Sequence, residues 1–250
     1  MKTVVIGDVH GRSLWKLIVN QENPDRVIFI GDYFDSFDIK GVDQLNNFLD
    51  IIEYKKSSGK EVIMLIGNHD FHYFPEVGDN GTSGYQKMFS YQISPTIDTN
   101  REHLQMAYQM DEFLFSHAGI SSAFLDSVFG INGWKTETIV EQVNELFKYK
   151  PLSFQFGMAV SIKKMSFLDP YGDNEEQSPI WIRHRSLMAA NRNTLRKQVI
   201  QIVGHTQVKK LDIDGAMKAA GGRYYLVDCQ GITGEYLIIQ NGELNVGQTR

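Results

Sequence analysis

The sequence has few of the features that mark secreted, membrane or nucleic-acid-binding proteins. Its 250 residues include one cysteine, so no internal disulfide can form and a disulfide-stapled secreted scaffold is excluded. The longest apolar stretches, such as residues 27–30, have the length of a strand and could not span a bilayer. Lys and Arg number 25 against 30 Asp and Glu, so the net charge of −5 gives no electrostatic footprint for nucleic acid or for an anionic membrane.

A leader segment is not expected either, because the first predicted strand begins almost at Met1 and leaves no room for a signal peptide. Hydrophobic residues make up 42% and charged residues 22% of the chain, as in an ordinary folded protein. No repeat, low-complexity tract or linker is visible. We therefore expect a soluble, cytoplasmic protein with one domain over residues 1–250, and a cap or insertion near 150–195, where the chain has mixed character.

The first seventy residues alternate between strand and helix patterns. Residues 3–6, 26–30 and 61–66 are apolar and β-branched, and each run stops at a glycine, which predicts three buried strands. Between them, residues 14–18 and 45–52 carry apolar side chains at helical spacing. Strands that alternate with helices favour a parallel sheet with helical crossovers, so the fold class is predicted to be α/β.

The rest of the chain is less regular. Residues 71–111 are expected to form loops and short helices, and residues 139–147 a clear amphipathic helix. Two further buried strands are predicted at 112–116 and 199–203. The tail over residues 224–246 has three strand patterns with an Asn-Gly turn before the last, which predicts a β-meander.

Polar residues follow each of the five predicted buried strands. These groups occupy residues 7–11, 31–35, 67–70, 117–119 and 204–206. Ligands collect at the carboxyl ends of strands in α/β sheets, because loops converge there on a rigid base. One such group alone would more often be a cap or a turn, but five in one chain indicate a site.

The residue types in these groups are those of a metal site. Asp8 and His10 are two residues apart, so an extended backbone directs both side chains the same way. The neighbouring glycines allow sharp turns and close approach to a metal or a phosphate. Carboxylate and amide oxygens together with imidazole nitrogens suit manganese, iron or zinc rather than calcium.

The ordered series Asp-x-His, Gly-Asp-x-x-Asp, Gly-Asn-His-Asp, His-Ala-Gly and Gly-His-Thr, over residues 7–206, resembles the calcineurin-like metallophosphoesterase superfamily. It is most similar to the phosphoprotein phosphatase branch, which includes bacterial Ser/Thr phosphatases and symmetrical diadenosine tetraphosphate hydrolases. The resemblance implies a two-sheet β-sandwich flanked by helices, with the active site at the carboxyl ends of strands. It also implies two divalent metal ions, with manganese favoured and iron or zinc compatible.

The resemblance further implies a role for each motif residue. Asp8 and His10 would hold the first metal, and Asp32 would bridge the two. The second metal would be held by three residues, which are Asn68, His117 and His205.

His69 would act as the general acid or contact the phosphate, with Asp35 orienting it, and Asn68 would also touch the substrate. A nearby carboxylate raises an imidazole pKa and fixes its tautomer, which is what proton transfer near neutral pH requires. The implied reaction is hydrolysis of a phosphomonoester or pyrophosphate by metal-bound hydroxide, without a covalent enzyme intermediate.

The chain departs from the family pattern at two positions. Ser36 stands where many relatives carry a phosphate-clamping arginine after Gly-Asp-x-x-Asp, and Asp70 stands where the protein phosphatases have glutamate. Arg183, in a Trp-x-Arg segment like that of the diadenosine tetraphosphate hydrolases, is a candidate replacement, and Arg12 is a second. A surface arginine on an irregular segment fits Arg183 equally well.

Several alternatives stay open. A phosphoprotein phosphatase and a dinucleoside polyphosphate hydrolase are nearly tied, so the expected partner is a phosphorylated substrate, either nucleotide-like or a phosphoprotein. A catalytically silent scaffold would predict decayed ligands, and a nuclease of the superfamily is disfavoured by the negative charge; membrane and nucleic acid are not expected partners. His72 is expected to face solvent or to support a site residue, and Cys229 to be a small buried side chain.

Overall fold

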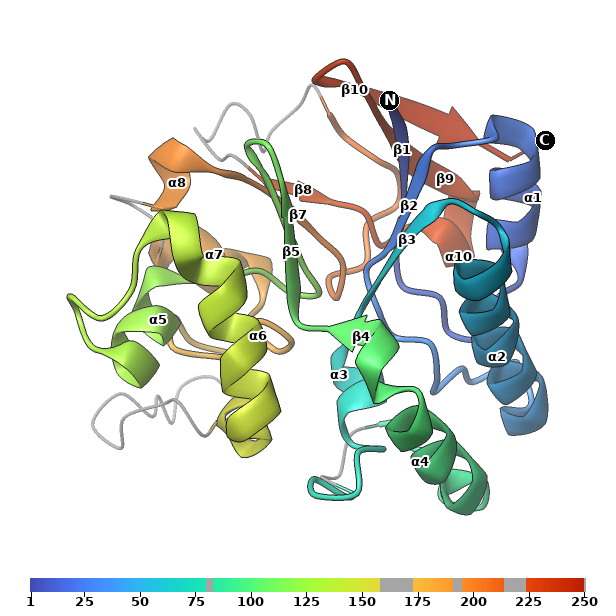
Figure 1. The fold of residues 1–250 in the computed structure, drawn as a ribbon, viewed down its shortest axis with the longest axis horizontal. Helices are drawn as coiled ribbons and strands as arrows, with labels where there is room; N and C mark the ends of the chain where they lie inside the picture. The colour runs from blue at the N-terminus through green and yellow to red at the C-terminus, as the bar shows by residue number, and fades with distance from the viewer. Residues whose placement is uncertain (80–82, 158–172, 191–194, 214–223, 250) are drawn as a thin grey trace.

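The computed structural model describes residues 1–79, 83–157, 173–190, 195–213 and 224–249, with only the backbone at residues 196 and 197. Over these residues the chain forms two mixed sheets flanked by helices (Figure 1). The first sheet has the order β10-β9-β1-β2-β3-β4, formed by β1 (Lys2–Ile6), β2 (Arg26–Phe29), β3 (Glu61–Leu65), β4 (Leu104–Gln105), β9 (Glu235–Gln240) and β10 (Glu243–Gln248). The second has the order β5-β6-β7-β8, formed by β5 (Ala107–Met110), β6 (Phe113–Ser116), β7 (Ile200–Val203) and β8 (Tyr224–Leu226).

Side chains that alternate along the strands produce the layers. In β1, Val4 and Ile6 face a core shared with the helices, whereas Val5 faces a core shared with the second sheet. From that second sheet, Phe113 and Phe115 of β6 enter the core between the sheets. A strand directs successive side chains to opposite faces, so each apolar strand serves two cores at once. The predicted α/β fold with two packed sheets is therefore confirmed.

Helices cover the outer faces of both sheets. The longer ones are α1 (Leu14–Glu22), α2 (Gly41–Ser57), α4 (Ser90–Thr99), α5 (Ser122–Phe129) and α6 (Ile139–Tyr149). The shorter ones are α3 (Asn68–Phe71), α7 (His184–Ala190), α8 (Leu195–Gln198), α10 (Gln230–Thr233) and the 3-10 turns η1 (Arg101–His103), η2 (Thr136–Thr138) and η3 (Pro151–Phe154). Trp15 of α1 and Phe48 of α2 are buried against the first sheet, and Figure 1 shows α5, α6 and α7 on the opposite side of the molecule.

The topology agrees with the predicted parallel order at the start of the chain and differs at its end. Strands β1, β2 and β3 pair in parallel, as the strand–helix alternation predicts. The predicted β-meander is wrong, because β8 pairs in parallel with β7 in the second sheet and only β9 and β10 form a hairpin. Strand periodicity does not say which sheet a strand joins. The Asn-Gly turn is present, with positive φ at Asn241 and Gly242, as a two-residue hairpin requires.

The expected cap near 150–195 is described in part. Residues 158–172 and 191–194 lie outside the described residues. The described segment around Ser178 and Trp181 packs behind the loop after β6, where the Pro179 carbonyl accepts a hydrogen bond from the Ala118 N–H at 2.6 Å. Among the described residues, no helix combines the length and apolar character needed to cross a membrane.

Candidate metal and catalytic site

The loops that follow β1, β2, β3, β6 and β7 meet at one edge of the sandwich, and glycines let them approach closely. A Cβ atom on Gly204 would lie 2.1 Å from Oδ1 of Asp8, and one on Gly67 would lie 2.0 Å from Oδ1 of Asp32. No side chain fits at such distances, so these two positions require glycine because of the carboxylates beside them. The glycines therefore bring residues that are distant in sequence into one site.

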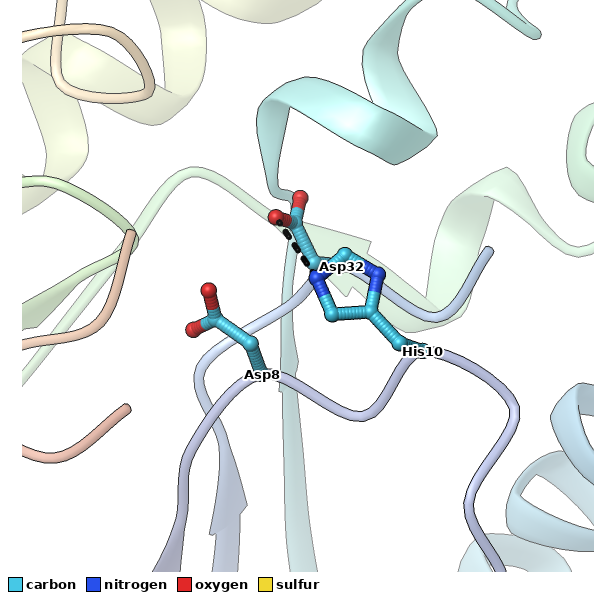
Figure 2. Close-up of side chains that lie close together, drawn as sticks. All are labelled: Asp8, His10 and Asp32. Atoms are coloured by element: carbon cyan, nitrogen blue, oxygen red, sulfur yellow. Dashed lines mark ion pairs between the residues drawn. The ribbon is translucent and has the colours of Figure 1, made fainter. Parts of the chain in front are cut away.

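The first cluster consists of Asp8, His10 and Asp32, whose ligand atoms all lie within 4.8 Å of one another. Figure 2 shows the His10 ring beside the Asp32 carboxylate, with Asp8 directed into the same space from the end of β1. Nε2 of His10 is 3.7 Å from Oδ2 of Asp32. Asp8 also accepts a hydrogen bond from the backbone N–H of His205, at 3.1 Å to Oδ2, which ties the first loop to the last.

The second cluster shares an oxygen atom with the first. Nε2 of His117 lies 3.4 Å from Oδ2 of Asp32, the same oxygen that faces His10. Oδ1 of Asn68 is 3.0 Å from Nε2 of His117 and 2.8 Å from Nδ1 of His205. The structure thus places all six predicted ligands together, with Asp32 between two groups of donor atoms.

Backbone carbonyls fix the tautomers of the three histidines. Nδ1 of His10 lies 2.6 Å from the Phe34 carbonyl, and Nδ1 of His117 lies 3.0 Å from the Ile30 carbonyl. Nε2 of His205 lies 3.1 Å from the Trp181 carbonyl. A carbonyl only accepts, so in each ring this nitrogen carries the proton and the other presents a lone pair to the cluster, as in metal-binding histidines.

Burial keeps these imidazoles neutral. It is the main cause that lowers the pKa of His10 to about 4 and that of His117 to about 3, and it also lowers the pKa of His205 well below its usual value. Burial and neighbouring carboxylates, Asp228 beside Asp8 among them, raise the pKa of Asp8 and Asp32 well above the usual range. The negative charges of the buried carboxylates repel one another, and the imidazole lone pairs face the same space. Divalent cations bound there would relieve this repulsion. The donor set therefore fits divalent metal ions.

The backbone at the site is strained in a consistent way. Four residues of the strand-end loops have positive φ although they are not glycine, at 42° for His10, 52° for Asp32, 65° for Asp35 and 61° for His205. Asp and His tolerate this region better than most residues, yet it costs of order 1–3 kcal/mol each and is found mostly at functional sites.

A second pair of side chains lies beside the metal-type clusters. Nδ1 of His69 is 2.9 Å from Oδ2 of Asp35. Burial alone would raise the pKa of Asp35, but interactions with His69 and His72 outweigh it and hold this pKa below its usual value. Asp35 is therefore an anion that fixes the proton of His69 on Nδ1, and Nε2 of His69 is the ring atom left for chemistry.

A pocket of about 440 Å³ opens over these groups. Its lining includes Asp8, His10, Asp35 and His69 together with Arg12, Ser36, Phe37, Asp38 and Asp228. Asp38 accepts hydrogen bonds from Ser36 Oγ at 2.5 Å and from Arg12 Nη2 at 3.2 Å, so a guanidinium is held beside the position where relatives carry arginine. Arg183 instead donates from Nη1 to the His205 carbonyl at 2.6 Å and does not belong to the described lining of the pocket.

Two acidic residues of this region were given no role from the sequence. Asp228 lines the pocket beside Asp8, and burial raises its pKa to about 6. Asp70 is fully buried and accepts hydrogen bonds from the backbone N–H groups of Asp32, Tyr33 and Gly67 at 2.8, 2.7 and 2.8 Å. The motif Gly-Asn-His-Asp contains Asp70, but only the fold shows that it joins the loops after β2 and β3. Cys229 is buried, as expected, and burial raises the pKa of its thiol to about 12.

Comparison with known proteins identifies the family and the fold. A family model described as calcineurin-like phosphoesterase matches residues 1–209. No curated protein sequence matches the chain.

Solved structures share the fold at low sequence identity. A point mutant of a cold-active protein tyrosine phosphatase superposes with a TM-score of 0.66 at 19% identity, covering 99% of this chain and 78% of that one. The cold-active protein tyrosine phosphatase of a psychrophilic Shewanella species gives 0.59 at 17%, covering 99% and 78%. A protein serine/threonine phosphatase from Saccharomyces cerevisiae gives 0.55 at 14%, covering 100% and 80%. At these identities the likeness concerns the fold.

Proposed function

Because the chain belongs to the calcineurin-like phosphoesterase family, we propose that it is a hydrolase of phosphomonoester or pyrophosphate bonds that uses two divalent cations, with manganese as the first candidate. The observation that carries this proposal is the position of Asp32. Its Oδ2 atom lies 3.7 Å from His10 Nε2 and 3.4 Å from His117 Nε2, between two groups of neutral donor nitrogens. One carboxylate between two donor groups is the arrangement that holds a pair of cations.

In this proposal Asp8, His10 and Asp32 hold one cation. The other is held by Asp32 together with three more residues, which are Asn68, His117 and His205. When bound, such a pair of cations activates water and neutralises charge on a phosphoryl group. The hydrogen bonds from the histidines to backbone carbonyls orient the lone pairs before any ion arrives.

The other side chains have roles in binding and proton transfer. His69 delivers a proton from Nε2 to the leaving oxygen, while its Nδ1–H stays on Asp35 and the carboxylate stabilises the imidazolium. Arg12 binds phosphate oxygens at the rim of the pocket, in place of the arginine missing at Ser36. Asn68 contributes to phosphate binding. Arg183 holds the backbone of His205 through its hydrogen bond to the His205 carbonyl.

The leaving group has room beside the catalytic pocket. A neighbouring cleft of about 880 Å³ shares Arg12 and Gly231 with it and is lined by residues of α1 and α2. Both a phosphorylated side chain on a protein and a nucleotide-like group fit this description, so the substrate is a phosphoprotein or a nucleotide-like molecule. The Trp-x-Arg segment adds little support for the nucleotide-like substrate, because Arg183 is not among the described residues that line the pocket.

The test combines metal content with hydrolysis. We expect the purified protein, loaded with manganese, to bind two ions per chain and to hydrolyse p-nitrophenyl phosphate. Asp32→Ala and His205→Ala should each reduce both, whereas His103→Ala, beside Glu102, should change neither. Unchanged metal content and turnover in the Asp32 and His205 variants would show that the site is wrong.

A substrate panel then separates the alternatives. A phosphopeptide, diadenosine tetraphosphate and bis-p-nitrophenyl phosphate are compared at equal concentration and at equal metal loading. Faster hydrolysis of the phosphopeptide supports a phosphoprotein phosphatase, and faster hydrolysis of the dinucleotide supports a dinucleoside polyphosphate hydrolase. Preference for the diester would favour a nuclease, and metal binding without any hydrolysis would favour a silent scaffold.

A further inference from the structure

The carboxylate of Asp35 has partners beyond His69. Oδ2 of Asp35, which faces His69 Nδ1 at 2.9 Å, also lies 2.7 Å from Nε2 of His72. Its other oxygen, Oδ1, accepts a hydrogen bond from the hydroxyl of Tyr73 at 2.6 Å. Asp35, His72 and Tyr73 are each 1% exposed. Two imidazole nitrogens and one hydroxyl thus lie against one buried carboxylate, and both of its oxygen atoms have a polar contact.

The local sequence explains why three polar side chains reach the same anion. His69, His72 and Tyr73 are separated by three and four residues, and α3 followed by a helical His72 (φ −72°, ψ −8°) places them on one face of a single turn. Asp35 comes from the opposite side, on the loop after β2, with φ 65°. One turn of chain therefore presents the proton-transfer histidine and two further polar side chains to the same carboxylate.

We propose that His72 and Tyr73 are positioning residues that hold the Asp35 carboxylate, and through it the His69 ring, in the orientation needed to protonate the leaving group. The proposal rests on the proposed function of His69. Without these partners, the Asp35 carboxylate is free to rotate about its side-chain bonds, and His69 loses the fixed acceptor that keeps its proton on Nδ1.

The surroundings prevent the two supporting side chains from turning away. The His72 ring meets Tyr73 edge-on at 4.5 Å between centroids and Tyr85 edge-on at 4.8 Å. Tyr73 and Tyr85 are stacked at 5.1 Å with 22° between their planes. The Tyr73 hydroxyl also accepts a hydrogen bond from the Gln86 N–H at 2.8 Å, so its proton is directed to Asp35.

The test uses the different need of two substrates for a general acid. Phenyl phosphate has a poor leaving group that requires protonation, whereas 2,4-dinitrophenyl phosphate has a good one that does not. General acid catalysis contributes about 10²–10⁴-fold, and we expect Tyr73→Phe to remove on the order of tenfold of it from kcat on phenyl phosphate. KM, metal content and kcat on the dinitrophenyl substrate should change little.

Two further variants supply controls. Tyr85→Phe also removes a hydroxyl from the stacked pair but leaves Asp35 untouched, so both rates should stay at the wild-type value. His72→Gln keeps an N–H donor and should retain more activity on phenyl phosphate than His72→Leu. If His72 and Tyr73 had a merely structural role, their replacement would lower kcat on both substrates together, and glutamine at position 72 would not restore it.

The outcomes separate this inference from the proposed function. One outcome is that His69→Ala selectively slows the hydrolysis of phenyl phosphate, whereas Tyr73→Phe and His72→Leu slow the hydrolysis of both substrates equally or of neither. In that case the positioning role is wrong and the proposed function stands. If His69→Ala shows no selectivity between the substrates, then the general-acid role of His69 is wrong and the positioning role fails with it.

Discussion

Replacement of Asp70 is the sharpest test of how the site is held together. This fully buried carboxylate accepts three backbone N–H groups, those of Asp32 and Gly67 on Oδ2 and that of Tyr33 on Oδ1. It joins the loop after β2, which carries the shared ligand Asp32, to the loop after β3, which carries Asn68. Asp70→Ala removes both acceptor oxygens and with them all three hydrogen bonds, and Asp70→Asn replaces one carboxylate oxygen by an NH₂ group that cannot accept.

The expected loss of stability follows from these contacts. A buried donor left without an acceptor costs about 1–3 kcal/mol, so three would cost about 3–9 kcal/mol if nothing relaxed. Part of this cost is recovered because the substitution also removes a buried carboxylate. Its burial is unfavourable for the charged form, as the pKa of Asp70, raised by burial to about 7, indicates. We expect Asp70→Ala to lower the free energy of unfolding by about 3–5 kcal/mol. Asp70→Asn keeps one oxygen for Asp32 and Gly67 and should lose about 1–3 kcal/mol.

Urea unfolding of the metal-free protein, followed by tryptophan fluorescence, measures both variants against Asp212→Ala, at an exposed aspartate between β7 and β8. The free energy is compared at a constant m value. A loss below about 1 kcal/mol for Asp70→Ala, below the cost of one unsatisfied donor, would refute the reasoning. So would an asparagine variant less stable than the alanine one.

Three further predictions concern metal binding and stability. Gly204→Ala should abolish metal binding, measured by metal analysis of the purified protein, because the added Cβ lies 2.1 Å from Oδ1 of Asp8; wild-type metal content would contradict this. Arg101→Leu should lower the free energy of unfolding by about 1 kcal/mol at pH 7 and by less at pH 3. The Arg101 hydrogen bonds hold the pKa of Glu76 below its usual value, so their stabilisation is present above the usual carboxyl pKa and is lost as pH falls through the lowered one. An equal loss of unfolding free energy at both pH values, measured with urea, would count against it. Chelation with EDTA should lower Tm without loss of far-ultraviolet circular dichroism, since a ligand at 100 times its Kd adds about 2.7 kcal/mol per site; loss of the folded signal would count against a preformed site.

The sequence was most informative where periodicity and motif coincide. Apolar runs that end in glycine predicted the parallel strands β1, β2 and β3, and the polar groups after them predicted which side chains would meet. The family was also predicted from these motifs and is confirmed by the match over residues 1–209. The roles of the ligands, of His69 and of Arg12 stay predictions, although the structure brings the six ligands together and places His69 and Arg12 in the lining of the pocket beside them.

Other features depend on contacts that no local pattern encodes. Asp70 reads as a variant of a motif glutamate, and its three backbone donors become visible only when two loops are placed side by side. Asp228 follows a strand in the tail and gives no sign that it lies beside Asp8, 220 residues away. The spacing of His72 after the motif was visible, yet its contact depends on Asp35 arriving from the loop after β2.

The strand-end loops are joined to one another by hydrogen bonds that need no metal ion. They run from His10 N to Asp32 O at 2.6 Å, from His117 Nδ1 to Ile30 O at 3.0 Å, from Gly204 N to His117 O at 2.7 Å and from His205 N to Asp8 Oδ2 at 3.1 Å. The loops after β1, β2, β6 and β7 therefore form a closed ring, and Asp70 attaches the loop after β3 to it.

This ring explains how the strained backbone is tolerated. Four residues at positive φ, His10, Asp32, Asp35 and His205, cost together about 4–12 kcal/mol at about 1–3 kcal/mol each, which is comparable with the whole stability of a domain, about 5–15 kcal/mol. Such strain persists only when the surroundings determine it, so the hydrogen bonds of the ring must offset it before ions bind. The free energy of metal binding then mainly relieves the repulsion between buried carboxylates and supports substrate binding, because it is not needed to fold the loops. A site built in this way keeps its geometry when the ions are removed, which is why chelation should lower Tm and leave the fold intact.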